Sequence, residues 1–139
     1  MTDLSAHHVG ITVADLDRAV DFYAGTLGLD VVAEFSVSGD AFADAVAVPG
    51  ATGSFTHLDA DGVRVELVEY DPAADARADA ALNEPGAVHV GFAVDDLDAF
   101  HAGLDDDVVT LSAPRTTESG TRICFVRDPE GNLVEVLET

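Results

Sequence analysis

Apolar and polar residues alternate over residues 8–13, near the start of the chain. Val9, Ile11 and Val13 fall on one side of an extended chain, and the residues between them, beginning with His8, fall on the other. A period of two over this length predicts a β-strand with one buried face.

The apolar spacing then changes from two residues to three or four. Apolar side chains recur at helical spacing up to residue 27: Leu16, Ala19, Val20, Tyr23 and Leu27. Asp15 or Asp17 can cap the first turn, and Gly28 follows the last apolar position. This pattern predicts an amphipathic helix directly after the strand.

The strand and helix pattern occurs twice. Residues 8–17 recur as residues 89–98, at an offset of 81, and residues 61–69 recur as residues 130–138, at an offset of 69. Because the offsets differ by 12, the first half carries about a dozen additional residues between its two motifs. The second copy also has apolar residues at helical spacing, namely Leu97, Phe100 and Leu104.

Three further strands are predicted in each half. They cover residues 30–37, 54–59 and 63–70 in the first half, and 107–111, 121–127 and 132–138 in the second. Turn residues at 59–62 and 128–131 join the last two strands of each half as hairpins. Each half is therefore predicted to be a βαβββ unit, which places the chain in the α+β class.

The predicted organisation is one domain made of two modules. Module one covers residues 1–70, a linker with Pro72 and Pro85 covers 71–87, and module two covers 88–139. A four-stranded sheet with one helix leaves its other face uncovered, so we expect the two modules to associate and enclose a space. The insertion at 38–53 is interpreted as a loop or short helix near the mouth of that space.

Charge excludes two classes of partner. The chain of 139 residues carries 27 acidic side chains against 6 arginines and no lysine, giving a net charge of -21. Such a surface repels nucleic acid and anionic membranes, so a small-molecule ligand is expected. The excess of Asp over Glu, 19 to 8, favours a halophilic protein adapted to concentrated salt; an ordinary acidic protein is the alternative.

Cysteine content and the start of the sequence bear on the compartment. Cys124 is the single cysteine, so neither an intrachain disulfide nor a thiolate zinc site is available. The first residues lack a basic and apolar leader, and no stretch approaches the roughly 20 apolar residues of a membrane span. We expect a cytoplasmic protein, with Cys124 as a small buried side chain.

Four residues that recur with the repeat could carry chemistry. Each half begins its first strand with a histidine and carries a glutamate in its last strand, which gives His8, Glu66, His89 and Glu135. Two imidazoles and two carboxylates suit a divalent first-row metal ion. Taken singly, a histidine at the start of a strand is more often structural or at the surface, and a glutamate in a strand is more often exposed to solvent.

The chain resembles the vicinal oxygen chelate superfamily, which includes glyoxalase I, extradiol dioxygenases and bleomycin resistance proteins. The resemblance rests on HVGITVxDLDxAxxFYxxxLGL at the start, then VELVEY, HVGFAVDDLD and FVRDPEGNLVEVLE. It implies paired βαβββ modules around a metal ion held by His8, Glu66, His89 and Glu135. His8 is preferred to His7, because it precedes Val-Gly as His89 does and because His7 is expected on the opposite face.

The resemblance to glyoxalase I implies a lyase or isomerase that abstracts a proton next to a carbonyl of a substrate with vicinal oxygens. Glu135 would act as the general base and Glu66 as its counterpart, with Ni, Co, Mn, Fe or Zn as the metal. The alternatives are a non-catalytic small-molecule binding protein of the resistance type and an Fe(II)-dependent extradiol-type dioxygenase. Residues 67–72 depart from the usual glyoxalase I pattern, which argues against glutathione as the thiol carrier.

The remaining polar residues are assigned lesser roles. Arg64 could contact an anionic substrate but is expected to pair with an acid, and Arg115 and Arg122 are expected to pair at the surface. The repeat aligns His57 with Val126, so His57 is interpreted as a packing variant. Since modules of this superfamily pair within one chain or between two, we expect a homodimer.

Overall fold

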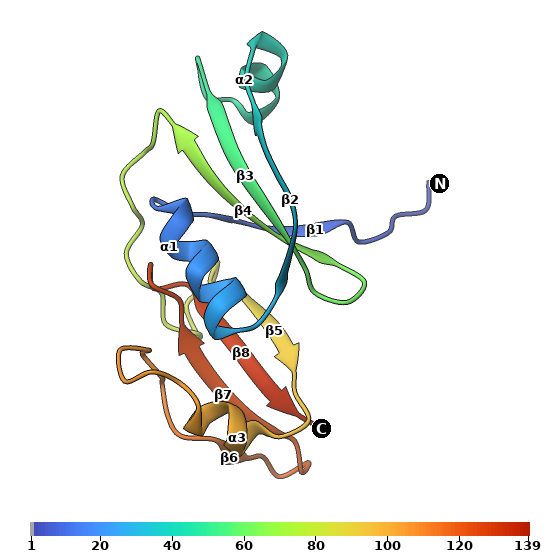
Figure 1. Ribbon diagram of the computed structural model, residues 1–139, viewed down its shortest axis with the longest axis vertical. Coiled ribbons are helices and arrows are strands. Elements are labelled where there is room, and N and C mark those ends of the chain that lie inside the picture. The colour runs from blue at the N-terminus through green and yellow to red at the C-terminus, as the bar shows by residue number, and fades with distance from the viewer. Residues whose placement is uncertain (1) are drawn as a thin grey trace. The chain divides into compact units, whose positions relative to one another are not determined.

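A computed structural model describes residues 2–139, which divide into two compact units, the first ending at Ala76 and the second covering Arg77–Thr139. Each unit holds one four-stranded mixed sheet and few helices (Figure 1). None of the helices formed by the described residues is long and apolar enough to cross a membrane.

The first unit contains β1 (His8–Thr12), α1 (Leu16–Val20), the π-helix η1 (Asp21–Thr26), β2 (Asp30–Val37), α2 (Asp40–Val46), β3 (Thr52–Asp59) and β4 (Arg64–Asp71). The strand order is β1-β4-β3-β2, with β1 parallel to β4 and the other neighbours antiparallel. The predicted insertion at 38–53 thus contains a short helix, α2, and the first residues of β3.

The second unit repeats this topology with β5 (His89–Ala93), α3 (Leu97–Ala102), β6 (Arg115–Thr116), β7 (Arg122–Arg127) and β8 (Leu133–Glu138). The order is β5-β8-β7-β6, and β5 is parallel to β8. The predicted α+β class with two βαβββ units is confirmed.

In each unit the core lies between the helix and one face of the sheet. In the first unit Tyr23, Leu58 and Leu67 are fully buried, and in the second Leu97 and Val134 are. Burying one such side chain stabilises the fold by roughly 1.5–3 kcal/mol. Because the helix covers that face, Glu66 of β4 and Glu135 of β8, which alternate with the buried residues, project from the other.

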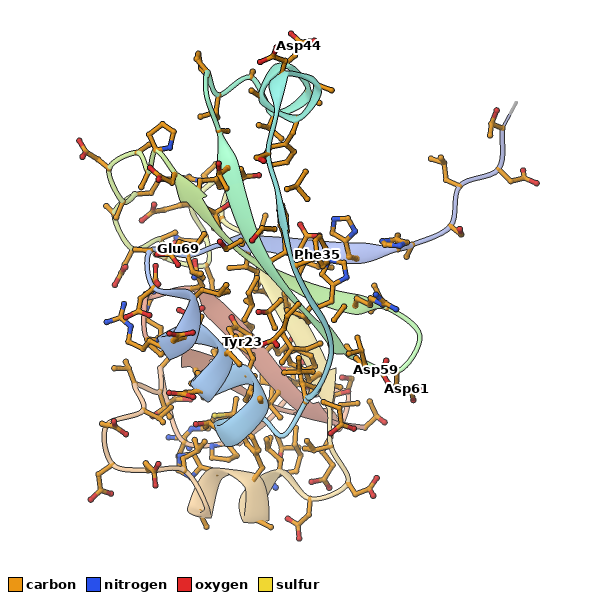
Figure 2. All side chains as sticks on the ribbon, turned by 45° about the horizontal axis from the view of Figure 1, so that its top comes forward. Tyr23, Phe35, Asp44, Asp59, Asp61 and Glu69 are labelled. Atoms are coloured by element: carbon orange, nitrogen blue, oxygen red, sulfur yellow. The ribbon has the colours of Figure 1, made fainter. Side chains whose placement is uncertain are left out.

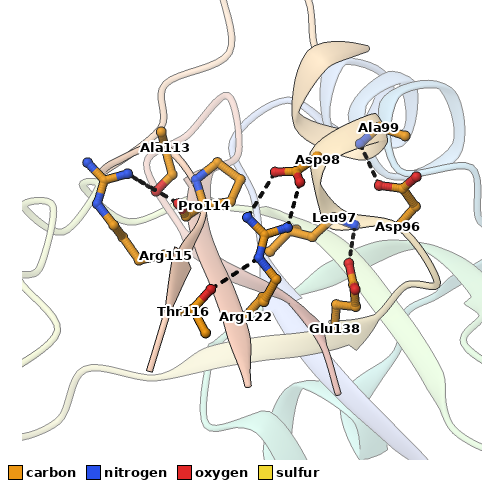
Figure 3. Close-up of polar contacts among 10 residues, drawn as sticks. All are labelled: Asp96, Leu97, Asp98, Ala99, Ala113, Pro114, Arg115, Thr116, Arg122 and Glu138. Carbon is orange, nitrogen blue, oxygen red and sulfur yellow. Dashed lines mark hydrogen bonds and ion pairs between the residues drawn. The ribbon is translucent and has the colours of Figure 1, made fainter. Parts of the chain in front are cut away.

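In each unit, two carboxylates at equivalent positions cap the helix that follows the first strand. Asp15 accepts a hydrogen bond from the backbone N–H of Arg18 in α1, so the cap is Asp15, one of the two predicted candidates. Glu69, labelled in Figure 2, accepts from the N–H of Leu16 at 3.4 Å. In the second unit Asp96 and Glu138 make the equivalent bonds to α3 (Figure 3).

The predicted strand at 107–111 is wrong. Residues 105–108 form a turn instead, closed by a bond from the Val108 N–H to the Asp105 carbonyl. Thr110 makes a single bridge to Val126, and the edge strand is the two-residue β6. The run of three aspartates favours the turn, since Asp side chains bond readily to nearby backbone.

Candidate metal centre

His8 and Glu66 come together because β1 runs parallel to β4. The register places Gly10 beside Glu66, and His8 precedes Gly10 by two residues on the same face of the strand. His8 Nε2 lies 3.6 Å from Glu66 Oε2. A Cβ atom added at Gly10 would lie 3.7 Å from Glu66 Oε1, so the glycine keeps this side of the carboxylate open.

The second unit builds the same pair in the same way. Gly91 lies beside Glu135 in the β5–β8 register, and His89 Nε2 lies 3.5 Å from Glu135 Oε1. The two glutamate side chains have similar exposure, 15% for Glu66 and 19% for Glu135. The two halves thus present near-identical His–Glu pairs.

These separations fit atoms that share a metal ion. Two ligand atoms at about 2.1 Å from one ion lie roughly 3.0–3.5 Å apart for bond angles of about 90–110°. The observed 3.5 Å is at the upper limit of that range and the observed 3.6 Å is just beyond it, and both are long for a hydrogen bond. Within residues 2–139, no group of three or more His, Cys, Asp or Glu side chains is arranged to hold a metal ion.

His7 lies beside His8 of the first pair, contrary to the prediction that it faces the other way. Its Nδ1 is 2.8 Å from His8 Nδ1, in a hydrogen bond that requires one of the two nitrogens to carry the proton. The strand begins at His8, so the alternation of faces does not extend to His7. When His8 Nδ1 donates to His7, the lone pair of His8 Nε2 is left facing Glu66.

His57 also contacts the His8–Glu66 pair, and the sequence alignment assigns it wrongly to packing. It lies opposite Glu66 in the β3–β4 register, its Nε2 is 2.7 Å from Glu66 Oε2, and its side chain is 5% exposed. Its structural equivalent is Phe125, opposite Glu135, instead of Val126. The β7–β8 turn is one residue longer than the β3–β4 turn, which shifts the alignment by one position and exchanges the faces.

The arginines have partners of different kinds. Arg64 Nη1 lies 3.2 Å from His57 Nδ1, so the expected pairing of Arg64 with an acid is wrong. Arg122 forms a two-point ion pair with Asp98, at 2.8 and 2.9 Å (Figure 3), which confirms its predicted surface pairing. The hydrogen bond from Arg122 lowers the pKa of Asp98 and raises that of Arg122. Arg115 donates to the carbonyls of Ala113 and Pro114.

Cys124 is buried, as predicted, and stands apart from the two pairs. Its thiol donates to the carbonyl of Ser112 at 3.5 Å. Burial raises the pKa of this thiol, so it stays protonated and a poor nucleophile. Cys124 has a structural role.

A groove in the first unit lies between α1 and strands β2 and β3. Its lining includes Asp17, Asp21 and Glu34 together with Ser36 and Ser54. Neither His8 nor Glu66 contributes to it. Its acidic lining carries no arrangement that resembles the His–Glu pairs.

Comparisons with solved structures give three informative neighbours. A glyoxalase family protein from Bacillus cereus is 25% identical with a TM-score of 0.88, covering 99% of this chain and 95% of that one. A lactoylglutathione lyase from Agrobacterium tumefaciens is 23% identical, with a TM-score of 0.64 and coverage of 99% and 96%. The trypanothione-dependent glyoxalase I of Leishmania major is 22% identical, with a TM-score of 0.69 and coverage of 98% and 87%.

A comparison with curated proteins gave no match. The family model of the Glyoxalase/Bleomycin resistance protein/Dioxygenase superfamily matches residues 5–136, nearly the whole chain. The match covers both βαβββ units and both His–Glu pairs. The chain therefore belongs to the Glyoxalase/Bleomycin resistance protein/Dioxygenase superfamily.

Proposed function

We propose that this protein is a metal-dependent lyase or isomerase similar to glyoxalase I, which moves a proton next to a carbonyl in a small substrate with vicinal oxygens. The duplicated His–Glu pair carries the proposal. Each pair lies at the same register of its sheet, with nitrogen and oxygen 3.6 Å apart in one unit and 3.5 Å in the other.

His8, Glu66, His89 and Glu135 are the proposed ligands of one divalent cation, two from each unit. The imidazole nitrogens and carboxylate oxygens suit Ni, Co, Mn, Fe or Zn. When bound, the ion would polarise a carbonyl oxygen of the substrate. We propose that the protein is a homodimer. The two pairs that hold one ion then come either from the same protomer or from different protomers.

Glu135 is the proposed general base. Its carboxylate is partly exposed, and among the described residues its polar neighbour is His89, whose Nε2 lies 3.5 Å from Glu135 Oε1. A carboxylate held this loosely can turn to accept a proton from the carbon next to the carbonyl and then return it. His8 and His89 would hold the site while the proton moves.

The substrate is proposed to lack a strongly anionic carrier. The net charge of -21 repels anions, and residues 67–72 do not follow the glyoxalase I pattern. The lactoylglutathione lyase and the trypanothione-dependent glyoxalase I share the fold of this chain, and that shared fold is their only support for the proposed reaction class.

A non-catalytic binding protein is the second candidate. The superfamily to which the chain belongs includes bleomycin resistance proteins, which supports this candidate. A ring-cleaving dioxygenase is less well supported, because it needs Glu66 turned away from the site, whereas Glu66 Oε2 lies 3.6 Å from His8 Nε2.

Metal analysis combined with turnover tests the proposal. The purified protein, supplied with each candidate metal, should retain one of them through desalting and convert adducts of 2-oxoaldehydes with neutral thiols. Glu135→Gln should lower kcat by about 10²–10⁴-fold, because the amide cannot accept the proton. Retention of no metal by the wild type, or turnover by Glu135→Gln at the wild-type rate, would contradict it. The matched control is Glu130→Gln, in the β7–β8 turn.

A further inference from the structure

The two His–Glu pairs differ in the residue that lies opposite the glutamate. In the first unit the residue opposite the glutamate is His57, whose Nε2 is 2.7 Å from Glu66 Oε2. In the second unit the same register position holds Phe125, whose ring packs edge-on against His89 at 5.2 Å between centroids. A phenyl ring has no hydrogen to donate to Glu135.

Arg64 fixes the direction of the hydrogen bonds in the first unit. A guanidinium has donors and no acceptor, so the contact of 3.2 Å requires Arg64 Nη1 to donate to a bare His57 Nδ1. The proton of the neutral ring is then on Nε2, which donates to Glu66. A bond of 2.7 Å to a carboxylate, from a ring that is 5% exposed, is short and shielded from water.

We propose that His57 is a positioning residue that fixes Glu66 as a permanent ligand, while Glu135, opposite Phe125, is left free to leave and take the proton. The role rests on the proposed function. Arg64 supports it by holding His57 in the Nε2–H tautomer. Although the two glutamates occupy equivalent positions of the repeat, His57 and Phe125 thus give them different roles.

Long-range ¹H–¹⁵N spectroscopy of the metal-free protein tests the hydrogen-bond chain separately from metal binding. The spectrum of wild-type protein should show His57 as the neutral Nε2–H tautomer. Arg64→Met, a change at an exposed position, should introduce the Nδ1–H form. A His57 that is Nδ1–H or doubly protonated in the wild type would overturn the assignment.

Titration with Co²⁺ tests the positioning role. His57→Phe, which copies the second unit, should weaken Co²⁺ binding by about tenfold or more, and His57→Gln, which keeps a donor, should restore most of the affinity. His101→Phe, in α3, is the matched control and should bind as the wild type does. Should His57→Phe not fold, Arg64→Met is expected to weaken binding severalfold.

The outcomes separate this role from the proposed function. Unchanged affinity in His57→Phe, or equal losses in the Phe and Gln variants, would overturn the positioning role while leaving the metal site in place. If His57→Phe does not fold, an Arg64→Met variant that binds Co²⁺ with the wild-type affinity would likewise overturn the positioning role. A wild-type protein that binds no Co²⁺ or other candidate metal would overturn the proposed function and, with it, the role of His57.

Discussion

At the scale of single residues, the strand register decides which side chain meets each glutamate: His57 lies opposite Glu66, and Phe125 lies opposite Glu135. The repeat is enough to single out His8, Glu66, His89 and Glu135, and the structure places each histidine beside the glutamate of its own unit. The contribution of His57 depends on strand register, which the alignment misses by one residue. A comparison of the lengths of the two hairpin turns is the signal that could have found it.

Cys124 gives a prediction at this scale. Its thiol should react with a disulfide reagent only after the protein is unfolded in denaturant, because the side chain is buried. Since burial raises the thiol pKa, the unfolded chain loses this proton at lower pH than the folded chain does. The free energy of unfolding should therefore fall as the pH rises above about 8.5, and Cys124→Ser should lessen that fall. Rapid labelling of the native protein would contradict the buried assignment.

At the scale of elements, the periodicity predicts the strands that pair within each sheet and the helix that follows each first strand. It fails at the edge of the second sheet, where β6 has two residues. It also cannot distinguish η1 from a continuation of α1, because Tyr23 is buried in η1 as it is expected to be in the predicted helix.

The two hairpin turns should differ in their effect on stability. Asp128 is buried and accepts from the N–H groups of Glu130 and Asn132 and from the Asn132 amide, each at 2.9 Å. Asp128→Ala should lower the free energy of unfolding by about 2–4 kcal/mol, because it removes the buried acceptor of three part-buried hydrogen bonds.

The first turn provides the control for this prediction. Asp59, at the turn labelled in Figure 2, accepts one exposed hydrogen bond of 3.2 Å from Asp61. Asp59→Ala should lower the free energy of unfolding by less than about 1 kcal/mol. Equal losses in urea titrations of the two variants would show that the Asp128 bonds do not set the stability of the second turn.

At the scale of the whole molecule, the net charge is expected to make the stability of the fold depend on salt concentration. With a net charge of -21, the folded chain repels itself unless salt screens the acidic groups. Circular dichroism should show a melting temperature that falls steeply, with loss of the folded signal, on dialysis from about 1 M to about 0.05 M KCl. The same melting temperature at both concentrations would point to an ordinary acidic protein.

The central claim is that the two His–Glu pairs serve one metal site, and counting bound ions in single-pair variants tests it most directly. Calorimetry with Co²⁺ or Ni²⁺ should give about one ion per chain for the wild type, and a change in either unit, His8→Ala or His89→Ala, should weaken that same binding event by about tenfold or more. A stoichiometry of two ions per chain would contradict the account. So would a variant in which the unchanged His–Glu pair still binds an ion with the wild-type affinity.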